Sequence, residues 1–110
     1  MTVSYFMRRD QIPEKTLPNG AKAQVFTGEK IQFSIVRIEP GQHVAEHSHP
    51  HEQAGTVLEG EFDLQIGDER QTLRPGDFYL IPGGVKHAAW GGQAAAVALD
   101  VFGPPREEYR

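Results

Sequence analysis

The stretch that decides the fold reads GQHVAEHSHPHEQ and runs from Gly41 to Gln53. It holds four of the five histidines of the chain. The fifth, His87, lies far downstream, just past the turn Pro82-Gly83-Gly84. We expect the fold to bring His87 beside this stretch, so that four side chains surround one metal ion: His47, His49, Gln53 and His87.

The spacing of the first two histidines suggests how they converge. Side chains two residues apart on a β-strand share a face, so His47 and His49 can point to one side, and Gln53 keeps the same parity. Neutral imidazole suits Zn, Fe, Ni and Cu, and an amide oxygen is a weaker ligand for the same ions. His43 is expected to face solvent, and His51 to hydrogen-bond the ligands from behind.

Length and composition predict one small all-β domain. The chain has 110 residues, with 12 Gly and 8 Pro that mark frequent turns. Roughly nine short strands alternate with these turns, as in a β-barrel or sandwich. An irregular segment 1–20 and a charged tail 103–110 flank them within a single domain 1–110. Outside the histidine segment, the expected strands cover residues 23–27, 31–39, 54–59, 61–66, 70–73, 78–81, 85–90 and 94–102.

Charge and cysteine content exclude several classes of function. The net charge is −4, with no basic block, so no nucleic-acid partner is expected. The absence of cysteine leaves only nitrogen and oxygen ligands for a metal. No run approaches the ~18 apolar residues of a membrane helix, so no membrane partner is expected. Residues 1–10 lack the apolar core of a signal peptide, which predicts a cytoplasmic protein.

The last expected strand carries a candidate proton-transfer group. Ala96, Ala98, Asp100 and Phe102 would share one face, and Val97, Leu99 and Val101 the other. Asp100 among small residues fits a general acid or base near the metal. The alternative is an acid at a strand end that faces solvent or pairs with Arg106. Three aromatic residues are expected in the core rather than in the cavity: Phe33, Tyr79 and Trp90.

Two motifs resemble those of the cupins. The pattern Gly41-x5-His47-x-His49-x3-Gln53-x6-Gly60 is similar to the first cupin motif, and Gly76-x5-Pro82-x-Gly84-x2-His87 to the second. The resemblance implies a small double-stranded β-helix, or jelly roll, with the metal inside the barrel. Gln53 stands where most cupins have Glu. An amide leaves the charge of a divalent ion uncompensated, which favours binding and polarising an anionic substrate.

A narrower resemblance extends from about Met7 to Tyr109. Three stretches look like the pectin-degradation cupins of the KdgF type: residues 47–53, 58–62 and 100–109. That family opens unsaturated uronates, which lyases release from pectin or alginate, to the linear 4-deoxy-5-keto form. The resemblance implies one divalent ion (Ni, Zn, Fe or Mn) and a small anionic sugar substrate. It places catalytic or substrate-contacting roles at Asp100, Phe102 and Arg106.

The resemblance also implies a homodimer, because cupins of this size are commonly dimeric. The outward face of the last strand, with Val97, Leu99 and Val101, would otherwise lie uncovered. Two other functions stay open. One is a metal-dependent cupin dioxygenase acting on another small molecule, which would consume oxygen. The other is a non-catalytic cupin that binds a small anion or sugar and turns nothing over.

Overall fold

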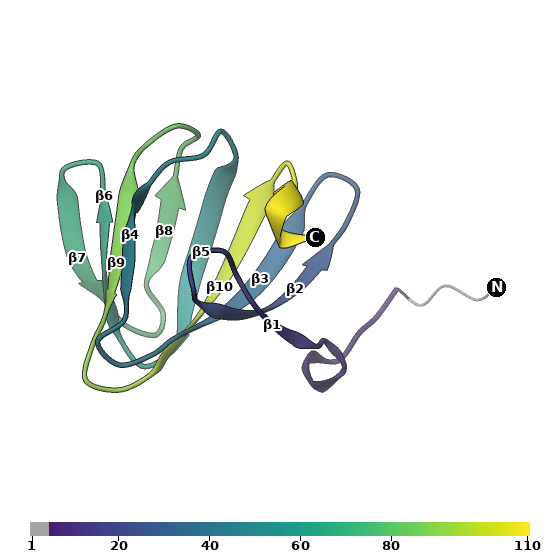
Figure 1. The fold of residues 1–110 in the computed structure, drawn as a ribbon, viewed down its shortest axis with the longest axis horizontal. Helices are drawn as coiled ribbons and strands as arrows, with labels where there is room; N and C mark the ends of the chain where they lie inside the picture. Colours follow the sequence, from purple (N-terminus) through teal and green to yellow (C-terminus); the bar gives the residue numbers. More distant parts are fainter. Residues whose placement is uncertain (1–4) are drawn as a thin grey trace.

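A computed structural model describes residues 5–110 and places ten strands in two facing antiparallel sheets (Figure 1). All-β architecture was predicted and is confirmed. None of the helices in the described part of the chain is long and apolar enough to cross a membrane. The strands are β1 (Glu14–Thr16), β2 (Lys22–Thr27), β3 (Gln32–Ile38), β4 (His43–His47), β5 (Glu52–Glu59), β6 (Phe62–Ile66), β7 (Glu69–Leu73), β8 (Phe78–Ile81), β9 (His87–Gly91) and β10 (Ala96–Gly103).

The chain passes repeatedly from one sheet to the other. The larger sheet has the order β1-β2-β3-β10-β5-β8, and the smaller β4-β9-β6-β7. Successive strands β3, β4 and β5 therefore lie in alternate sheets, as do β8, β9 and β10, which gives the jelly-roll topology. One consequence is that β4 pairs with β9, although about forty residues separate them. In that pairing His47 lies opposite His87.

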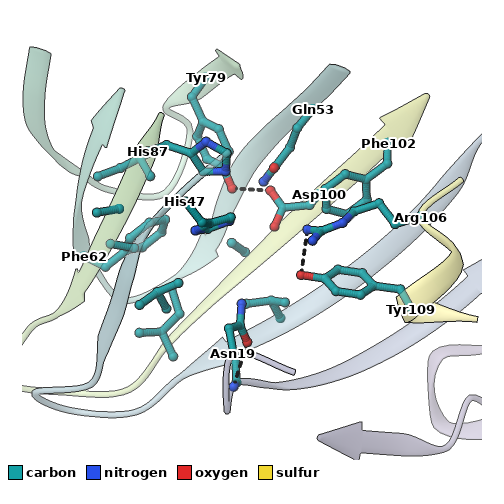
Figure 2. A pocket seen from close by; sticks show the side chains of 18 residues that line it. Asn19, His47, Gln53, Phe62, Tyr79, His87, Asp100, Phe102, Arg106 and Tyr109 are labelled. Carbon is teal, nitrogen blue, oxygen red and sulfur yellow. Dashed lines mark hydrogen bonds between the residues drawn. The ribbon is translucent and has the colours of Figure 1, made fainter. Parts of the chain in front are cut away.

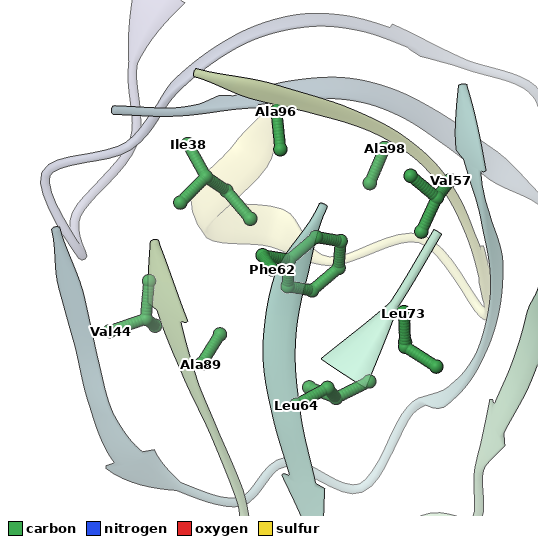
Figure 3. Close-up of a cluster of buried hydrophobic side chains, with 9 residues drawn as sticks. All are labelled: Ile38, Val44, Val57, Phe62, Leu64, Leu73, Ala89, Ala96 and Ala98. Atoms are coloured by element: carbon green, nitrogen blue, oxygen red, sulfur yellow. The ribbon is translucent and has the colours of Figure 1, made fainter. Parts of the chain in front are cut away.

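The apolar core fills one end of the space between the sheets (Figure 3). Strand β10 shows how the core passes into the site. Its inward face begins with Ala96 and Ala98, which belong to the core, and continues with Asp100 and Phe102. All four are buried, as expected from the alternation along this strand. The other core residues are Ile38, Val44, Val57, Phe62, Leu64, Leu73 and Ala89.

The outward face of the larger sheet is apolar and only partly covered. The strand registers align one row of side chains across β2, β3, β10, β5 and β8: Phe26, Phe33, Val101, Ala54 and Leu80. Apolar side chains stand on both faces of strand 31–39, which by itself predicts that both faces are covered. In the structure Ile38 on the inward side is buried, while Phe33 and Ile35 on the outward side are only half-buried.

Both terminal segments are more ordered than the sequence suggested. The segment 1–20, expected to be irregular, contains a 3-10 helix (Arg9–Gln11) and strand β1, which forms a hairpin with β2. Its residues 1–4 lie outside the described part. A strand of three residues beside Pro13 leaves too short a pattern to recognise. The charged tail 103–110 folds back as a second 3-10 helix (Glu107–Tyr109), and Tyr109 is buried.

Candidate metal centre

Three imidazoles meet at one end of the barrel. One ring nitrogen from each of His47, His49 and His87 lies within 4.8 Å of the other two. The ring of His47 lies 4.3 Å from that of His87, and the ring of His49 lies 4.9 Å from that of His87, centroid to centroid. Among the described residues, these three form the cluster able to hold a metal ion.

The route by which His49 reaches this cluster differs from the expected one. His47 and His87 belong to strands β4 and β9, but β4 ends at His47 and His49 lies in the loop 48–51. The argument from strand parity was therefore wrong for His49. The turn between β8 and β9 holds this loop instead. The backbone N–H of Gly84 donates to the carbonyl of His49 at 2.8 Å.

The ring nitrogens of the three histidines are already divided between two roles. Each Nδ1 lies 2.9–3.0 Å from a backbone carbonyl oxygen: that of Ala45 for His47, of His51 for His49, and of Val85 for His87. A carbonyl only accepts, so each Nδ1 carries the proton and each Nε2 keeps its lone pair. Nε2 of His87 is buried with no hydrogen-bond partner among residues 5–110. Such a lone pair fits a metal ion.

The amide of Gln53 completes the donor set. Its Oε1 lies 3.1 Å from Nε2 of His49. With the proton of His49 on Nδ1, two acceptor atoms face one another, which is unfavourable unless a cation lies between them. The other end of the amide donates a hydrogen bond to Asp100. The residues present therefore fit a divalent ion held by three imidazole nitrogens and one amide oxygen.

The surroundings of His49 and His87 favour their uncharged form. Burial lowers the pKa of His87 from 6.5 to about 4. Burial also lowers the pKa of His49, and the positive charge of Arg106 acts in the same direction. Neutral imidazole is the form that binds metal. Protons therefore compete with a metal for these two side chains only below the usual range of histidine.

The metal centre opens into a cavity that also receives residues from the C-terminal part of the chain (Figure 2). The cavity offers about 70 Å³ to the centres of water-sized molecules. That is room for several waters or one small ligand. Polar side chains from both ends of the sequence line it, among them Asn19, His47, Gln53, His87, Asp100 and Arg106, with Phe102 and Tyr109 as aromatic walls.

Asp100 is buried in this cavity, with only 7% of its surface exposed. The hydroxyl of Tyr79 donates to its Oδ1 at 2.6 Å, and Gln53 donates a second hydrogen bond. Burial raises the pKa of Asp100 from 3.8 to about 6, although both hydrogen bonds and the charge of Arg106 oppose the rise. Asp100 thus neither faces solvent nor forms an ion pair with Arg106, which were the alternatives for this residue.

Arg106 is held in place from several sides. Its Nε and Nη2 lie 2.8 Å from Oε1 of Glu108, and its Nη1 donates to the hydroxyl of Tyr109 at 2.9 Å. The guanidinium carbon lies 4.1 Å from the ring centre of Tyr109 and 5.3 Å from that of Phe102. The buried amide of Gln32 bonds both the backbone N–H and the carbonyl of Arg106. The charged tail is thus part of the cavity wall.

Sequence reasoning missed Tyr79, which was expected in the core. The alternation along Phe78–Ile81 was the available signal, because it places Tyr79 on the same face as the fully buried Ile81. The other two aromatics of that group lie away from the cavity. Trp90 stacks on His43 at 5.3 Å with the guanidinium of Arg70 over its ring, and Phe33 stacks on Phe26.

The remaining two histidines lie outside the cluster. His43 is exposed, as expected. The contribution of His51 is its carbonyl, which accepts the hydrogen bond from His49. Its own Nδ1 is buried without a hydrogen-bond partner in the described part of the chain. The expected hydrogen bond between His51 and a candidate ligand therefore involves the backbone of His51 and not its ring.

The fold is a small jelly-roll barrel, and three histidines and one amide at one end of its cavity can bind a metal ion. These features define a class of β-barrel proteins that bind small ligands. The chain belongs to the cupin family, whose Cupin domain matches residues 34–102. This range contains the metal-site residues and Asp100, but not Arg106 or Tyr109.

Individual proteins resemble the chain over nearly its whole length. The pectin degradation protein KdgF of Dickeya dadantii (strain 3937) is 26% identical over 102 residues, which cover 91% of this chain and 93% of that protein. An RmlC-like cupin from Shewanella frigidimarina NCIMB 400 superposes with a TM-score of 0.88 at 25% identity, covering 98% of this chain and 97% of that one. KdgF from Halomonas sp. superposes with a TM-score of 0.87 at 23% identity, covering 99% and 100%.

Proposed function

We propose that the protein converts 4,5-unsaturated uronates to their linear 4-deoxy-5-keto forms with the help of one divalent metal ion. The observation that carries the proposal is the content of a single cavity. A neutral metal-ligand set, a buried carboxyl group and an arginine line the same small space. These are the three kinds of group that opening a charged cyclic enol ether requires: a Lewis acid, a proton carrier and an anion anchor.

The relatives support this substrate class. The Dickeya protein is named for pectin degradation, and its match covers 91% of this chain, more than the shared cupin domain at residues 34–102 does. The cavity is small, which agrees with a small ligand. The metal ligands in this proposal are His47, His49, Gln53 and His87, and the ion is Ni, Zn, Fe or Mn.

Each group has one part in the mechanism. A divalent ion held by neutral ligands supplies a Lewis acid that stabilises negative charge on substrate oxygen. Arg106 presents a planar fork suited to the substrate carboxylate. Glu108 occupies that fork in the structure, and its side chain is 46% exposed, so it can turn to solvent when the substrate carboxylate takes its place. Phe102 packs against the sugar and helps to exclude water.

Asp100 carries the proton. It takes the proton of the anomeric hydroxyl while the bond between C1 and the ring oxygen breaks, which leaves an aldehyde at C1 and an enolate at C5. It then delivers the same proton to C4, and the enolate becomes the 5-ketone. Atoms and electrons balance without a co-reactant, because substrate and product are isomers. A carboxyl group with a pKa of about 6 suits a group that must accept and return a proton near neutral pH.

The test uses the ultraviolet absorbance of the conjugated double bond. Metal-loaded protein mixed with a lyase-generated unsaturated uronate should remove this absorbance faster than the spontaneous reaction, and a chelator should abolish the gain. Asp100→Asn should lower kcat by about 10² or more, the range of general acid–base catalysis, with metal content unchanged. Glu107→Gln, at an exposed carboxylate of the tail, is the matched control and should keep full activity.

The outcomes separate the proposal from its alternatives. Full turnover by Asp100→Asn would remove this residue from the mechanism. Equal binding of saturated and unsaturated uronates without any turnover would indicate a non-catalytic binding protein. Oxygen consumption that depends on another small molecule would indicate a dioxygenase.

We also propose a homodimer formed through the outward face of the larger sheet. Phe78 and Leu80 on the edge strand β8 are 78% and 57% exposed, and Leu80 continues the apolar row that crosses this sheet. A second copy would cover them.

A further inference from the structure

A row of three residues crosses the larger sheet behind the candidate site. In the strand registers, Asp100 of β10 lies opposite Gly55 of β5, and Gly55 lies opposite Tyr79 of β8. Residues aligned in this way share one face of the sheet, here the face toward the cavity. The first and the third carry side chains, and the middle one carries none.

The missing side chain of Gly55 is what lets Tyr79 reach Asp100. A Cβ atom added to Gly55 would lie 2.3–2.4 Å from Cζ, Cε2 and the hydroxyl oxygen of Tyr79. The phenol ring therefore lies directly over Gly55 and spans the strand between β8 and β10. Its hydroxyl ends 2.6 Å from Oδ1 of Asp100 (Figure 2). The backbone of Gly55 is not in the left-handed region, so space and not conformation requires glycine here.

The phenol can only serve Asp100 as a donor. Its surroundings are apolar on the far side, where Phe62 meets its ring edge to face at 6.4 Å. Burial first, and the charge of Asp100 second, raise the pKa of Tyr79 well above 10. It therefore keeps its proton throughout the physiological range and has no proton to exchange with substrate. Figure 2 shows the second oxygen of Asp100 pointing away from Tyr79, into the cavity.

We propose that Tyr79 is a positioning residue for the reaction, because it holds one oxygen of Asp100 so that the other faces the substrate. The missing side chain of Gly55 provides the space for the ring of Tyr79. The inference rests on the proposed function for the role of Asp100, while the Tyr79–Asp100 contact itself does not depend on it. A carboxyl group that is held by a fixed donor does not have to be oriented again when the substrate binds. Even a small displacement of such a group from the reacting atoms lowers the rate of the chemical step.

The experiment is a double-mutant cycle with Tyr79→Phe and Asp100→Asn, measured by loss of ultraviolet absorbance from an unsaturated uronate. Tyr79→Phe should lower kcat about tenfold, the equivalent of one lost hydrogen bond, with KM and metal content within twofold of wild type. The double variant should be no slower than Asp100→Asn, because Tyr79 acts through Asp100. Gly55→Ala should reproduce the loss of kcat. Tyr5→Phe, which removes the same hydroxyl from a side chain that is 91% exposed, is the matched control.

Wild-type kcat in Tyr79→Phe would overturn the inference. So would a double variant that is slower than Asp100→Asn by the full factor of Tyr79→Phe, because the two residues would then act independently. If wild-type protein turns over no uronate, the proposed function fails separately. Urea unfolding of wild type, the two single variants and the double variant then tests the contact between Tyr79 and Asp100. Shifts in unfolding midpoint that do not add support it, and additive shifts overturn it.

Discussion

At the residue scale, Gln53 explains more of the site than its place in the motif suggests. Its oxygen faces the point where the imidazoles converge, and its nitrogen donates to Asp100. A glutamate here, as in most cupins, would place a second carboxylate beside Asp100 and offer it no donor. Two adjacent carboxylates compete for protons. The amide therefore suits a site in which the neighbouring carboxyl group is a proton carrier.

Gln53→Glu should tighten metal binding and weaken catalysis. The added negative charge compensates the ion, while Asp100 loses a donor and gains a repelling neighbour. We expect affinity for Zn, measured by competition with a chromophoric chelator, to rise, and kcat on an unsaturated uronate to fall at least tenfold. A variant with stronger metal binding and unchanged kcat would show that the amide has no part in the chemistry.

The buried carboxyl group of Asp100 should leave a signature in the pH dependence of stability. Its pKa is about 6 in the folded protein and about 3.8 in the unfolded chain. The folded state thus holds the proton more tightly, and stability from this group is present below pH 4 and is lost as the pH rises through 6. Asp100→Asn cannot ionise. Its free energy of unfolding relative to wild type should therefore increase between pH 4 and pH 7.5, by about 3 kcal/mol at most for two pKa units.

Urea unfolding in the presence of a chelator measures this difference. His49 and His87 titrate in both proteins with the opposite sign, since their lowered pKa values favour folding as the pH rises, and they cancel in the comparison. Asp63→Asn is the matched control. A hydrogen bond from Thr72 lowers the pKa of Asp63 from 3.8, so the stability from this group changes below pH 4 and this variant should show almost no change relative to wild type between pH 4 and pH 7.5. An Asp100→Asn difference that stays constant with pH would contradict the buried state of this carboxyl group.

At the scale of elements, the turn between β8 and β9 supports the metal centre from outside. A Cβ atom on Gly83 would lie 2.3 Å from the carbonyl oxygen of Pro50. The same turn bonds the carbonyl of His49 through Gly84. Gly83 and Gly84 thus have a physical purpose, because they allow this turn to approach the loop 48–51 closely enough to hold His49 in place.

Gly83→Ala should therefore weaken metal binding without touching a ligand. The methyl group forces the loop 48–51 away, and loss of such outer support typically lowers metal affinity 10- to 100-fold. Gly28→Ala, in the turn between β2 and β3, is the control, because its Cβ would meet its nearest atom at 3.3 Å and lies away from the site. The chelator competition assay should separate the two variants, and equal affinities would contradict this role of the turn.

For the whole molecule, the outward face of the larger sheet governs the expected assembly. We expect light scattering to give a mass twice that of one chain. Leu80→Glu places a charge in the apolar row of Val101 and Ala54 and should yield a folded monomer, because Leu80 is exposed in the single chain. Gln65→Glu, on the smaller sheet, should leave the mass unchanged. A wild-type monomer, or a dimer that survives Leu80→Glu, would place the interface elsewhere or remove it.

The amino-acid sequence by itself determined the strand content, the inward face of β10 and the identity of the candidate ligands. The first two follow from local patterns, namely turns at Gly and Pro and the alternation along Ala96–Phe102, while the candidate ligands follow from the two motifs that resemble those of the cupins. The bounds of β8 were predicted as they are found, because Phe78–Ile81 stands between two clear turns.

Only the tertiary structure decided which atoms meet. The approach of His87 to His47 comes from the pairing of β4 with β9, the place of His49 from a bond to Gly84, 35 residues away, and the contact of Tyr79 with Asp100 from the missing side chain of Gly55 on the strand between them. Each of these contacts joins segments far apart in the chain. The sequence motifs predicted that His87 approaches His47, but local patterns carry no record of the other two contacts, because register and distance between remote segments are fixed by packing of the whole barrel.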